Sequence, residues 1–540
     1  MLVQPPNSAA VAGRLLERYC TDFGTKCLSA CKTVGGFEGE GALRNPLIIH
    51  ADRLFWQVYQ RPGRTMRLII EARIDDGDSD TKRDGSTIVA IVDREDKDLS
   101  QLGLTLAEGR SLLNDVQSAL VSQQVETWLS ANTRCRRCGS ALSHKDSRSI
   151  VVRTVFGKMA LESPRLWSCA CAVKSGAARH STSPLCKALP KRVTPELECL
   201  QVKWAAHLPF RQATALLKEV LPLDKGISFS GTRNRVHAVG KALDAEIERD
   251  ITQHPQCLVG ESPGQSDNVS CVSVDSAWLR CCEKSETQAR HVNIVAGRAT
   301  FDKRAPRVYA YVHKEVSSAA ARLDQFLSRN GVTPDKRVSI ISDDAGEFRK
   351  AVEGSQLARD KILDWFHIAM KFKAAENAVF GCKQIEPLER EEVKAEIRSA
   401  KWLVWHGKGS KAVARIKALD ALLLERQDYE FGTLWWNLRG IAGYVRNNAP
   451  ALVNYGARYR KGLPISSSIA ESAVNQVVSL RMAKKRQMRW TDAGAHHLVQ
   501  VRVAVLNGEL SPSRLARLGR PTTMRSSRNM LSEVTQRLAA

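Results

Sequence analysis

The sequence is 540 residues long, which at about 150 residues per domain predicts three or four domains rather than a single core. Hydrophobic residues make up 43% of the chain and charged residues 26%, a globular balance that excludes global disorder and a collagen-like repeat. The 81 Lys and Arg residues outnumber the 57 Asp and Glu residues, and the formal charge of +24 favours a polyanionic partner such as nucleic acid.

The sequence shows no export signal or membrane segment. Residues 1–10 lack the basic segment and apolar core of a secretory signal, and no apolar run approaches the roughly 18 residues that span a bilayer. We therefore expect a cytoplasmic protein without a membrane partner. The 14 cysteines are too irregularly spaced for a disulfide framework, so a cluster of them in a reducing compartment indicates metal binding.

Residues 1–130 predict an α+β region of unknown role. Apolar and polar residues alternate in 55–60 and 66–74, on either side of a Pro-Gly turn signal, which predicts a β-hairpin. Thr105 and Glu108 have the spacing of a capping box, and helical periodicity follows to Leu129.

Cysteine pairs in residues 131–190 predict a zinc-ribbon-like module. Cys135 and Cys138 precede Gly139, which suits a tight turn, and Cys169 and Cys171 follow two strand-like segments that form a hairpin. A hairpin brings two such pairs together around one tetrahedral zinc ion. Ordinary buried cysteines are the alternative. Residues that could replace one ligand are His144, His180 and Cys186.

Residues 191–255 predict a helical module. One helix starts at Thr194-Pro195-Glu196 and runs to about 207, a second fits 210–220, and a third is capped by Ser228 or Ser230 and ends near Arg249. This order fits a helix-turn-helix that reads DNA, although a plain helical linker domain is the alternative. The residues presented by the last helix would be Arg233, Asn234, Arg235 and His237, with Arg233 and Arg235 as the candidate DNA contacts.

Residues 268–367 predict the first part of a ribonuclease-H-like core. The order is three strands, a helix from about 317 to 328 and two further strands, which indicates a mixed α/β sheet. Asp275 lies on the first strand and Asp343 ends the fourth. Asp344 is the alternative to Asp343 as the second acid. Consecutive strand residues point to opposite faces, so only one of the two can face the metal. Such cores bind two divalent cations between carboxylates, and hard cations such as Mg²⁺ prefer oxygen ligands.

A third carboxylate is needed further along the chain. Glu471 lies in the first turn of a helix that follows a serine-rich segment. Ser468 and Glu471 also have the spacing of a capping box, and the spacing alone favours this capping role.

Several long segments resemble bacterial insertion-sequence DDE transposases of the ISKra type, over most of the chain from about Cys135 to Leu510. The most specific segments are Ile362-Leu-Asp-Trp-Phe-His-Ile-Ala-Met, Asn447-Asn-Ala-Pro, Asn454-Tyr-Gly-Ala-Arg-Tyr-Arg, Glu471-Ser-Ala-Val-Asn-Gln-Val-Val and Arg481-Met-Ala-Lys-Lys-Arg-Gln-Met-Arg-Trp-Thr. The resemblance implies that Asp275, Asp343 and Glu471 are the catalytic acids, and it moves Glu471 from a cap to a metal ligand that can serve both roles.

Two features depart from the family pattern, and a third matches a motif of related transposases. The family often has Thr-Asp-Gly where this chain has Ser342-Asp343-Asp344, which leaves the second acid between two neighbours. The Cys-x-Cys pair is tighter than the usual Cys-x-x-Cys. Asp364 and His367 fall in a motif that resembles the Asp-x-x-His beside the active sites of related transposases, where its role is supportive or structural.

The remaining residues predict an all-α insertion, the end of the core and a basic tail. Residues 368–460 look helical, and their tryptophans, among them Trp402, Trp405, Trp435 and Trp436, are expected mainly to pack its core, with stacking on a DNA base as a secondary role. Residues 461–510 hold the final catalytic helix, and 511–540 form the tail. Basic residues that follow the catalytic helix and are expected to contact DNA phosphates are Lys484, Lys485, Arg486 and Arg489.

The expected function is that of a DNA transposase that binds insertion-sequence ends and catalyses metal-dependent strand cleavage and transfer. The expected cofactors are two Mg²⁺ ions, for which Mn²⁺ can substitute, and a structural Zn²⁺. The partners would be double-stranded DNA, both terminal inverted repeats and target, with a homodimer or larger assembly that is nucleoid-associated when bound. The alternatives are a catalytically inactive DNA-binding regulator and a structure-specific nuclease without strand transfer.

Overall fold

The computed structural model describes residues 49–51, 54–60, 65–73, 86–95, 102–176, 178–223, 226–253, 269–282, 290–343, 346–466, 472–482 and 488–518. The chain divides into two compact units, residues 1–102 and residues 103–540, and each is described by itself. None of the helices in these ranges is long and apolar enough to cross a membrane.

The first unit contains an antiparallel sheet in the order β1-β2-β3-β4, formed by Ile49–Ala51, Leu54–Gln60, Thr65–Arg73 and Ser86–Glu95. Strands β2 and β3 pair from Leu54 with Ala72 to Gln60 with Met66, which confirms the predicted hairpin. Ile70, Val89 and Val92 are buried, and the register of β3 with β4 shifts between Ile70 and Glu71. The loop predicted from 75 to 85 lies outside the described residues.

The second unit begins with a long helix and a β-hairpin. Helix α2 (Leu106–Asn132) starts at a capping box in which the Thr105 and Glu108 side chains each bond the other's backbone N–H, as predicted. Strands β5 (His144–Thr154) and β6 (Gly157–Trp167) pair antiparallel along their whole length, and β7 (Ser181–Thr182) extends this sheet. Short helices α3 (Ala170–Lys174) and α4 (Pro184–Ala188) follow the hairpin.

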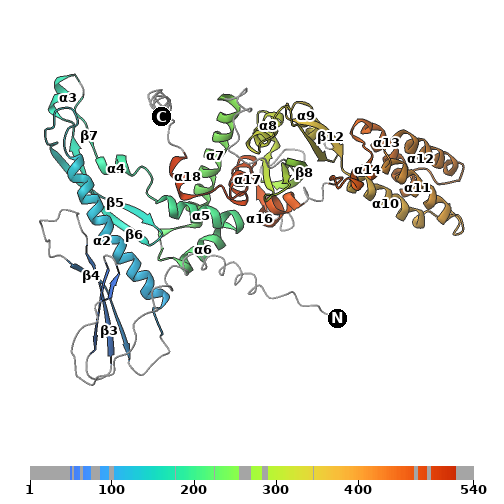
Figure 1. Cartoon of the computed structure of the whole chain (residues 1–540). Helices are drawn as coiled ribbons and strands as arrows, with labels where there is room; N and C mark the ends of the chain where they lie inside the picture. Colours follow the sequence, from blue (N-terminus) through green and yellow to red (C-terminus); the bar gives the residue numbers. More distant parts are fainter. Residues whose placement is uncertain are drawn as a thin grey trace, which may run out of the picture. The chain divides into compact units, whose positions relative to one another are not determined.

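Three helices follow at the predicted positions. They are α5 (Pro195–His207), α6 (Phe210–Val220) and α7 (Phe229–Gln253), and all three contact one another. Helices α5 and α7 also pack against α17 (Asp492–Leu506), and Val236 of α7 shares one hydrophobic core with Ala277 and Leu279 of the large sheet. The helical module therefore forms part of the covering of the sheet (Figure 1).

The large sheet is mixed and six-stranded, with the order β10-β9-β8-β11-β12 and β13 beside β8. Strands β8, β9 and β10 are antiparallel neighbours, whereas β8, β11 and β12 run parallel. The strands are β8 (Val269–Cys281), β9 (His291–Phe301), β10 (Arg307–Val312), β11 (Val338–Ser342), β12 (Ala358–Leu363) and β13 (Arg489–Trp490). Helix α8 (Ala319–Arg329) connects β10 to β11, and α9 (Gly346–Glu353) connects β11 to β12. The chain is thus a mixed α/β protein, as the sequence predicts.

The two faces of the sheet carry different cores. Val272 and Val274 of β8 pack with residues of α8 such as Leu323, on one face. Ala277 and Leu279 point the opposite way, because side chains alternate along a strand, and pack with α17 and with residues 473–482. Asp275 shares the parity of Ala277 and therefore lies on this second face.

A helical segment follows β12 and was expected from the sequence. It comprises α10 (Trp365–Gly381), α11 (Arg390–Trp405), α12 (Gly409–Leu424), α13 (Thr433–Asn447), the 3₁₀ turn Ala449–Ala451 and α14 (Tyr455–Arg460), and α10 begins three residues before the predicted start at 368 (Figure 1). Trp435 is buried in its core, and Trp405 is partly buried. The expectation of core packing is wrong for Trp402 and Trp436, which are 54% and 60% exposed because they point away from the shared core.

The helix that was expected to carry the third acid is described from Ser472 onward. It contains a π-helical stretch at Asn475–Ser479 and continues as α16 (Leu480–Met482). Ala473, Val474 and Val477 pack in the same core as Ala277 of β8. The chain that directly follows Glu471 therefore covers the face of the sheet that carries Asp275.

Candidate functional site

Four cysteines converge at one end of the β5–β6 hairpin. The Sγ atoms of Cys135 and Cys171 are 3.7 Å apart and those of Cys138 and Cys169 are 3.4 Å apart. All four Sγ atoms lie within 4.8 Å of one another. The four residues are the ones that the sequence predicts as ligands of one ion.

Local backbone geometry explains how these pairs form. Gly139 has a φ of +72°, and its N–H donates to the Cys135 carbonyl at 2.9 Å, which closes the turn around the first pair. Cys169 is the N-cap of α3, so Cys171 lies in the first turn of a helix. Cys169 itself has an extended backbone, so the Cys-x-Cys pair spans the change from extended to helical backbone at the start of α3.

The arrangement fits zinc. A tetrahedral ion with Zn–S bonds of about 2.3 Å requires sulfur atoms about 3.8 Å apart, close to the two distances given above. Hydrogen bonds with Ser140 lower the pKa of Cys138 to about 6, and shared hydrogen bonds with the other thiols raise the pKa of Cys171 to about 12. The cluster thus supplies a thiolate, the form that binds metals, and can hold a structural zinc ion.

The three alternative ligands contact other groups. The His144 ring is 3.1 Å from the Ser147 hydroxyl, the His180 ring is 3.0 Å from the Ala178 carbonyl, and Cys186 accepts from Arg192 at 3.2 Å. None of them belongs to the group of four.

Three aspartates lie level with one another on three neighbouring parallel strands. Asp275 lies within β8, whereas Asp343 and Asp364 directly follow β11 and β12. Ser342 of β11 is level with Val274 of β8 and with Leu363 of β12. The next residue on each path is Asp343, Asp275 or Asp364, so these aspartates form one row across β8, β11 and β12, with neighbouring strands about 4.8 Å apart. Residues in register point to the same face of a sheet. We call Asp275, Asp343 and Asp364 the carboxylate row.

The pKa of His367 is raised by all three members of the carboxylate row. Its Nδ1 atom lies 2.6 Å from Oδ2 of Asp364, and this hydrogen bond is the main cause that raises the pKa of His367. The charges of Asp343 and Asp275 raise the pKa further. One imidazole on the first turn of α10 therefore lies within electrostatic range of all three carboxylates.

Asp364 is the most constrained member of the row. It is fully buried and caps α10, because its Oδ1 accepts the Phe366 N–H at 2.8 Å while Oδ2 contacts His367. Its own N–H donates to the Ser342 carbonyl at 3.0 Å, which ties it to β11. These contacts agree with a supportive role, and the position of Asp364 in the row was not evident from its sequence.

Glu471 and Asp344 lie outside the described residues. The nearest described neighbour of Glu471 is Ser472, whose hydroxyl accepts a hydrogen bond from Nη1 of Arg298 at 3.0 Å. Arg298 of β9 pairs with Ser273, and Ala296 pairs with Asp275, so Arg298 and Asp275 are diagonal neighbours on one face. Among the described residues the cysteine group is the only one whose ligand atoms all lie within 4.8 Å, so the row is more widely spaced than the cysteines.

Arg298 was missed in the sequence, where a lone arginine on a strand carries no signal. Its Nε atom is buried and has no hydrogen-bond partner among the described residues. A guanidinium beside Asp275 places a positive charge on a face that otherwise gathers carboxylates.

The basic residues proposed to contact DNA divide into three groups. Arg233 and Arg489 are exposed. Arg235 is half-buried, its Nη1 donates to the Gln201 side chain at 2.8 Å, and burial lowers its pKa. Lys484, Lys485 and Arg486 lie outside the described residues.

Two other arginines are buried instead of exposed. Arg502 donates to the carbonyls of Ala206, Gln476 and Val477, and burial lowers its pKa to about 9. Arg481 donates to the Ala205 carbonyl at 2.8 Å, and burial lowers its pKa to about 10. Both guanidiniums thus join the helix at 472–482 to the end of α5.

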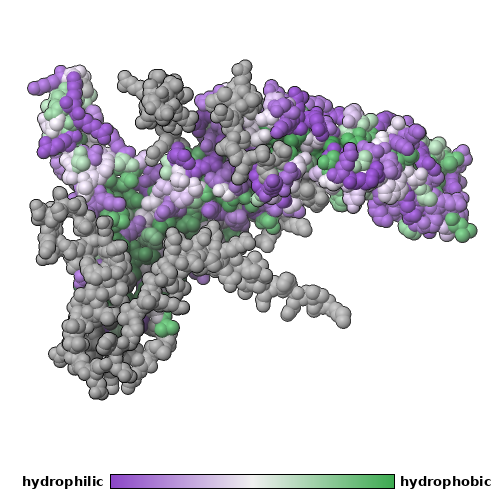
Figure 2. Space-filling view, in the orientation of Figure 1, coloured by the Kyte–Doolittle hydropathy of each residue, from purple (hydrophilic) through white to green (hydrophobic). Residues whose placement is uncertain are grey.

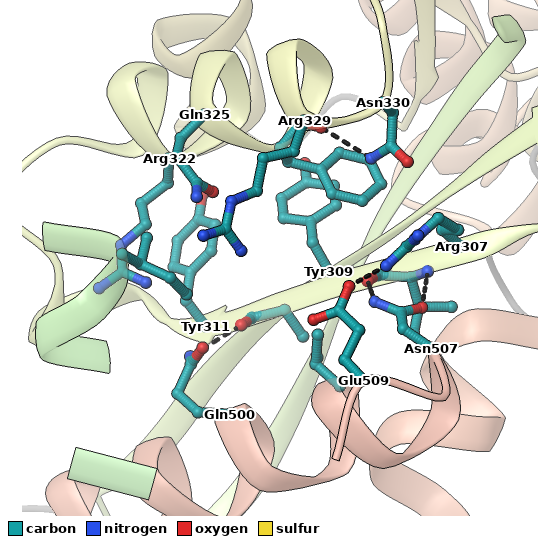
Figure 3. A pocket seen from close by; sticks show the side chains of 15 residues that line it. Arg307, Tyr309, Tyr311, Arg322, Gln325, Arg329, Asn330, Gln500, Asn507 and Glu509 are labelled. Carbon is teal, nitrogen blue, oxygen red and sulfur yellow. Dashed lines mark hydrogen bonds and ion pairs between the residues drawn. The ribbon is translucent and has the colours of Figure 1, made fainter. Parts of the chain in front are cut away.

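A cavity of about 70 Å³ lies between β10, α8 and the end of α17, and three arginines line it (Figure 3). Each arginine has an acidic partner: Arg307 pairs with Glu509, Arg322 with Asp244 and Glu248, and Arg329 with Asp250. A charge that is neutralised by the fold is not available to a ligand, so this cavity is a structural junction of α7, α8 and β10.

The chain matches no protein-family model, and no curated protein is significantly similar to it. The class that its geometry defines is an α/β protein with a candidate four-cysteine metal centre and a row of carboxylates across three parallel strands.

Proposed function

We propose that this protein is a DNA transposase with a ribonuclease-H-like core. The observation that carries the proposal is the level row of Asp275, Asp343 and Asp364 on adjacent parallel strands. The order of three antiparallel strands followed by two parallel strands supports the same core, and the helices α10–α14 would be an insertion before its last helix.

Asp275 and Asp343 would hold the divalent cations, with Glu471 as the third ligand. Support for Glu471 comes from its neighbour Ser472, which bonds to Arg298 on the Asp275 face. The chemistry of the row fits the ions, because carboxylate oxygens are the ligands that Mg²⁺ or Mn²⁺ takes. When bound, such ions activate a water or a DNA 3′-hydroxyl and stabilise the leaving oxygen.

The protein's own residues would arrange this site. Asp364 holds the His367 ring beside the row, and His367 in its charged form offsets part of the negative charge of the carboxylates. Arg298 would fix the start of the helix that carries Glu471. The net charge of +24 would attract the DNA, with Arg233 and Arg489 among the exposed cations near the fold's helical module and β13.

The remaining modules would recognise the element ends. The cysteine group with zinc and the helices α5–α7 would bind the terminal repeats. Because two ends must be processed together, the protein would act as a homodimer or a larger assembly. Binding would place each end across the carboxylate row.

The experiment is incubation of the purified protein with DNA that carries its own flanking element ends and Mg²⁺, with strand cleavage and joined products scored. We expect Asp275→Asn, Asp343→Asn and Glu471→Gln to abolish cleavage while end binding is retained. Asp360→Asn is the matched control, because Asp360 is exposed on β12 and precedes the carboxylate row. This variant should cleave DNA as the unmodified protein does. Cleavage without joined product would indicate a nuclease, and binding without cleavage in the unmodified protein would indicate a regulator.

A further inference from the structure

An aromatic cluster extends from the end of β12 to the surface of the helical segment, and its members are Trp365, Trp402, Trp405, Tyr455 and Tyr459. Its inner end is fixed beside the carboxylate row. The buried Tyr455 donates its hydroxyl to the Leu363 carbonyl at 2.8 Å, directly before Asp364. The rings of Trp365 and Tyr455 are 5.1 Å apart, and those of Trp365 and Trp405 are 4.7 Å apart.

The outer end of the cluster is exposed. The ring of Trp405 lies 5.9 Å from that of Trp402 and 6.0 Å from that of Tyr459. Trp402 is 54% exposed and Tyr459 is 67% exposed. A Cβ atom at Gly456 would lie 2.6 Å from Nε1 of Trp405, so only glycine lets α14 approach this ring. The helices are thus built so that two exposed rings flank one supported ring.

Positive charge directly follows one of the exposed rings, Tyr459. Arg458, Arg460 and Lys461 lie at the end of α14, the segment 455–461 contains no acid, and Arg460 and Lys461 are exposed. Arg458 also acts at the sheet, because its charge lowers the pKa of Cys271 on β8 against the larger effect of burial, which raises it. On the face shown in Figure 2 the surface over α10 to α14 is largely hydrophilic.

Rings beside cations are the combination that single-stranded nucleic acid recognises. Every base has a π-face that stacks on an aromatic side chain, while the adjoining phosphates are neutralised by Lys and Arg. Bases inside a duplex are already stacked on one another and cannot use such rings. The two exposed residues that directly follow Tyr459 are both charged, which favours a polyanionic partner at this point over an apolar one.

We propose that unpaired bases of a DNA strand that reaches the carboxylate row stack on Trp402 and Tyr459, while Arg460 and Lys461 contact its phosphates. The identity of this strand as the one that is cut rests on the proposed function. The stacking itself does not, because it needs neither metal nor cleavage.

The test compares two labelled DNA probes in the absence of divalent cations: a forked duplex with one unpaired arm and a fully paired duplex of the same sequence. We expect Trp402→Ala and Tyr459→Ala each to weaken binding of the fork by about 5- to 150-fold, and to leave binding of the paired duplex unchanged. Trp436→Ala is the matched control, because Trp436 is 60% exposed on α13 but belongs to a different ring cluster, with Phe431 and Trp435. It should bind both probes as the unmodified chain does.

A fork whose unpaired arm is abasic separates stacking from other effects. The unmodified protein should bind this probe at least as weakly as Trp402→Ala binds the normal fork, because the abasic arm removes stacking on both rings, and Trp402→Ala should bind the abasic probe no more weakly than the unmodified protein does. Equal losses on the forked and paired probes, no loss on the fork, or the same loss in Trp436→Ala would each overturn the inference. Tighter, ring-dependent binding of an RNA arm would overturn the assignment to DNA. Because these measurements do not involve cleavage, a protein that fails to cut DNA but shows the ring-dependent preference would refute only the proposed function.

Discussion

Replacement of one cysteine in the four-cysteine group tests the metal centre directly. A structural zinc site in small peptides contributes about 10–16 kcal/mol at pH 7. Divided equally over the four thiolates, this gives roughly 2.5–4 kcal/mol for each ligand, or about a 70- to 900-fold change in zinc affinity. We therefore expect Cys138→Ser to bind zinc weaker by that factor, because a hydroxyl is a poor substitute for the thiolate that the Ser140 contacts favour.

The assay is a competition between the protein and a chromogenic zinc chelator, together with the zinc content after dialysis. Cys186→Ser is the control, because Cys186 contacts Arg192 and Ser163 outside the group and its loss should leave zinc affinity unchanged. Amide exchange should also rise in residues 134–142 and 168–176 of Cys138→Ser while the large sheet stays protected. An unmodified protein that holds no zinc, or a Cys138→Ser variant with undiminished affinity, would refute the reasoning.

Three further predictions concern charge and packing. His367→Gln should lower the melting temperature most at and below about pH 6.5. Because the pKa of His367 is raised in the folded protein, the charged His367–Asp364 pair stabilises the fold fully below the unfolded pKa and loses this effect as the pH rises through the higher folded pKa. A difference from the unmodified protein that stays constant from about pH 5.5 to about pH 8.5 would contradict this. Arg322→Met should lower the free energy of unfolding in urea by about 3–5 kcal/mol, because Arg322 is only 4% exposed and its loss takes this cation from Asp244 and Glu248. Arg329→Met breaks a half-exposed pair between the same helices and should cost at most about 1 kcal/mol. Equal costs would argue against burial as the cause. Gly240→Ala should destabilise the fold by at least about 1–3 kcal/mol, because its Cβ would lie 2.2 Å from the His497 carbonyl oxygen on α17. Gly443→Ala meets no atom within 4 Å and should stabilise the fold by up to about 1 kcal/mol through helix propensity. Thermal unfolding of both variants would reveal whether the two changes in stability have opposite signs.

The secondary structure was largely predictable from the sequence. Helix α6 spans Phe210–Val220 as predicted, because its apolar residues repeat at helical spacing, and the Thr105–Glu108 box marks the start of α2. Strands β8 and β11 were predictable from their runs of small and β-branched residues, although β8 continues past Asp275 to Cys281. These signals are local, and each is contained in a few neighbouring residues.

The parts that depend on tertiary contacts were not predictable. The level row of Asp275, Asp343 and Asp364 follows from the register of three strands, which no local pattern specifies. Arg481 and Arg502 are both buried, and carbonyls at the end of α5 accept their N–H groups, which no local pattern in the sequence specifies. Trp402 looked like a core residue because hydrophobicity does not reveal which side of α11 is covered.

The π-helical stretch Asn475–Ser479 controls the rotation of the helix around its own axis. Each residue of an α-helix advances about 100°, so the wider turn shifts the angular position of everything before it relative to everything after it. Arg502 binds the Gln476 and Val477 carbonyls and keeps this shift in place. Deletion of one residue from the stretch would therefore turn Ser472 about a quarter of a revolution away from Arg298 while Val501 and its neighbours on α17 stayed where they are, so the direction of the helix start depends on a segment a few residues further along the chain.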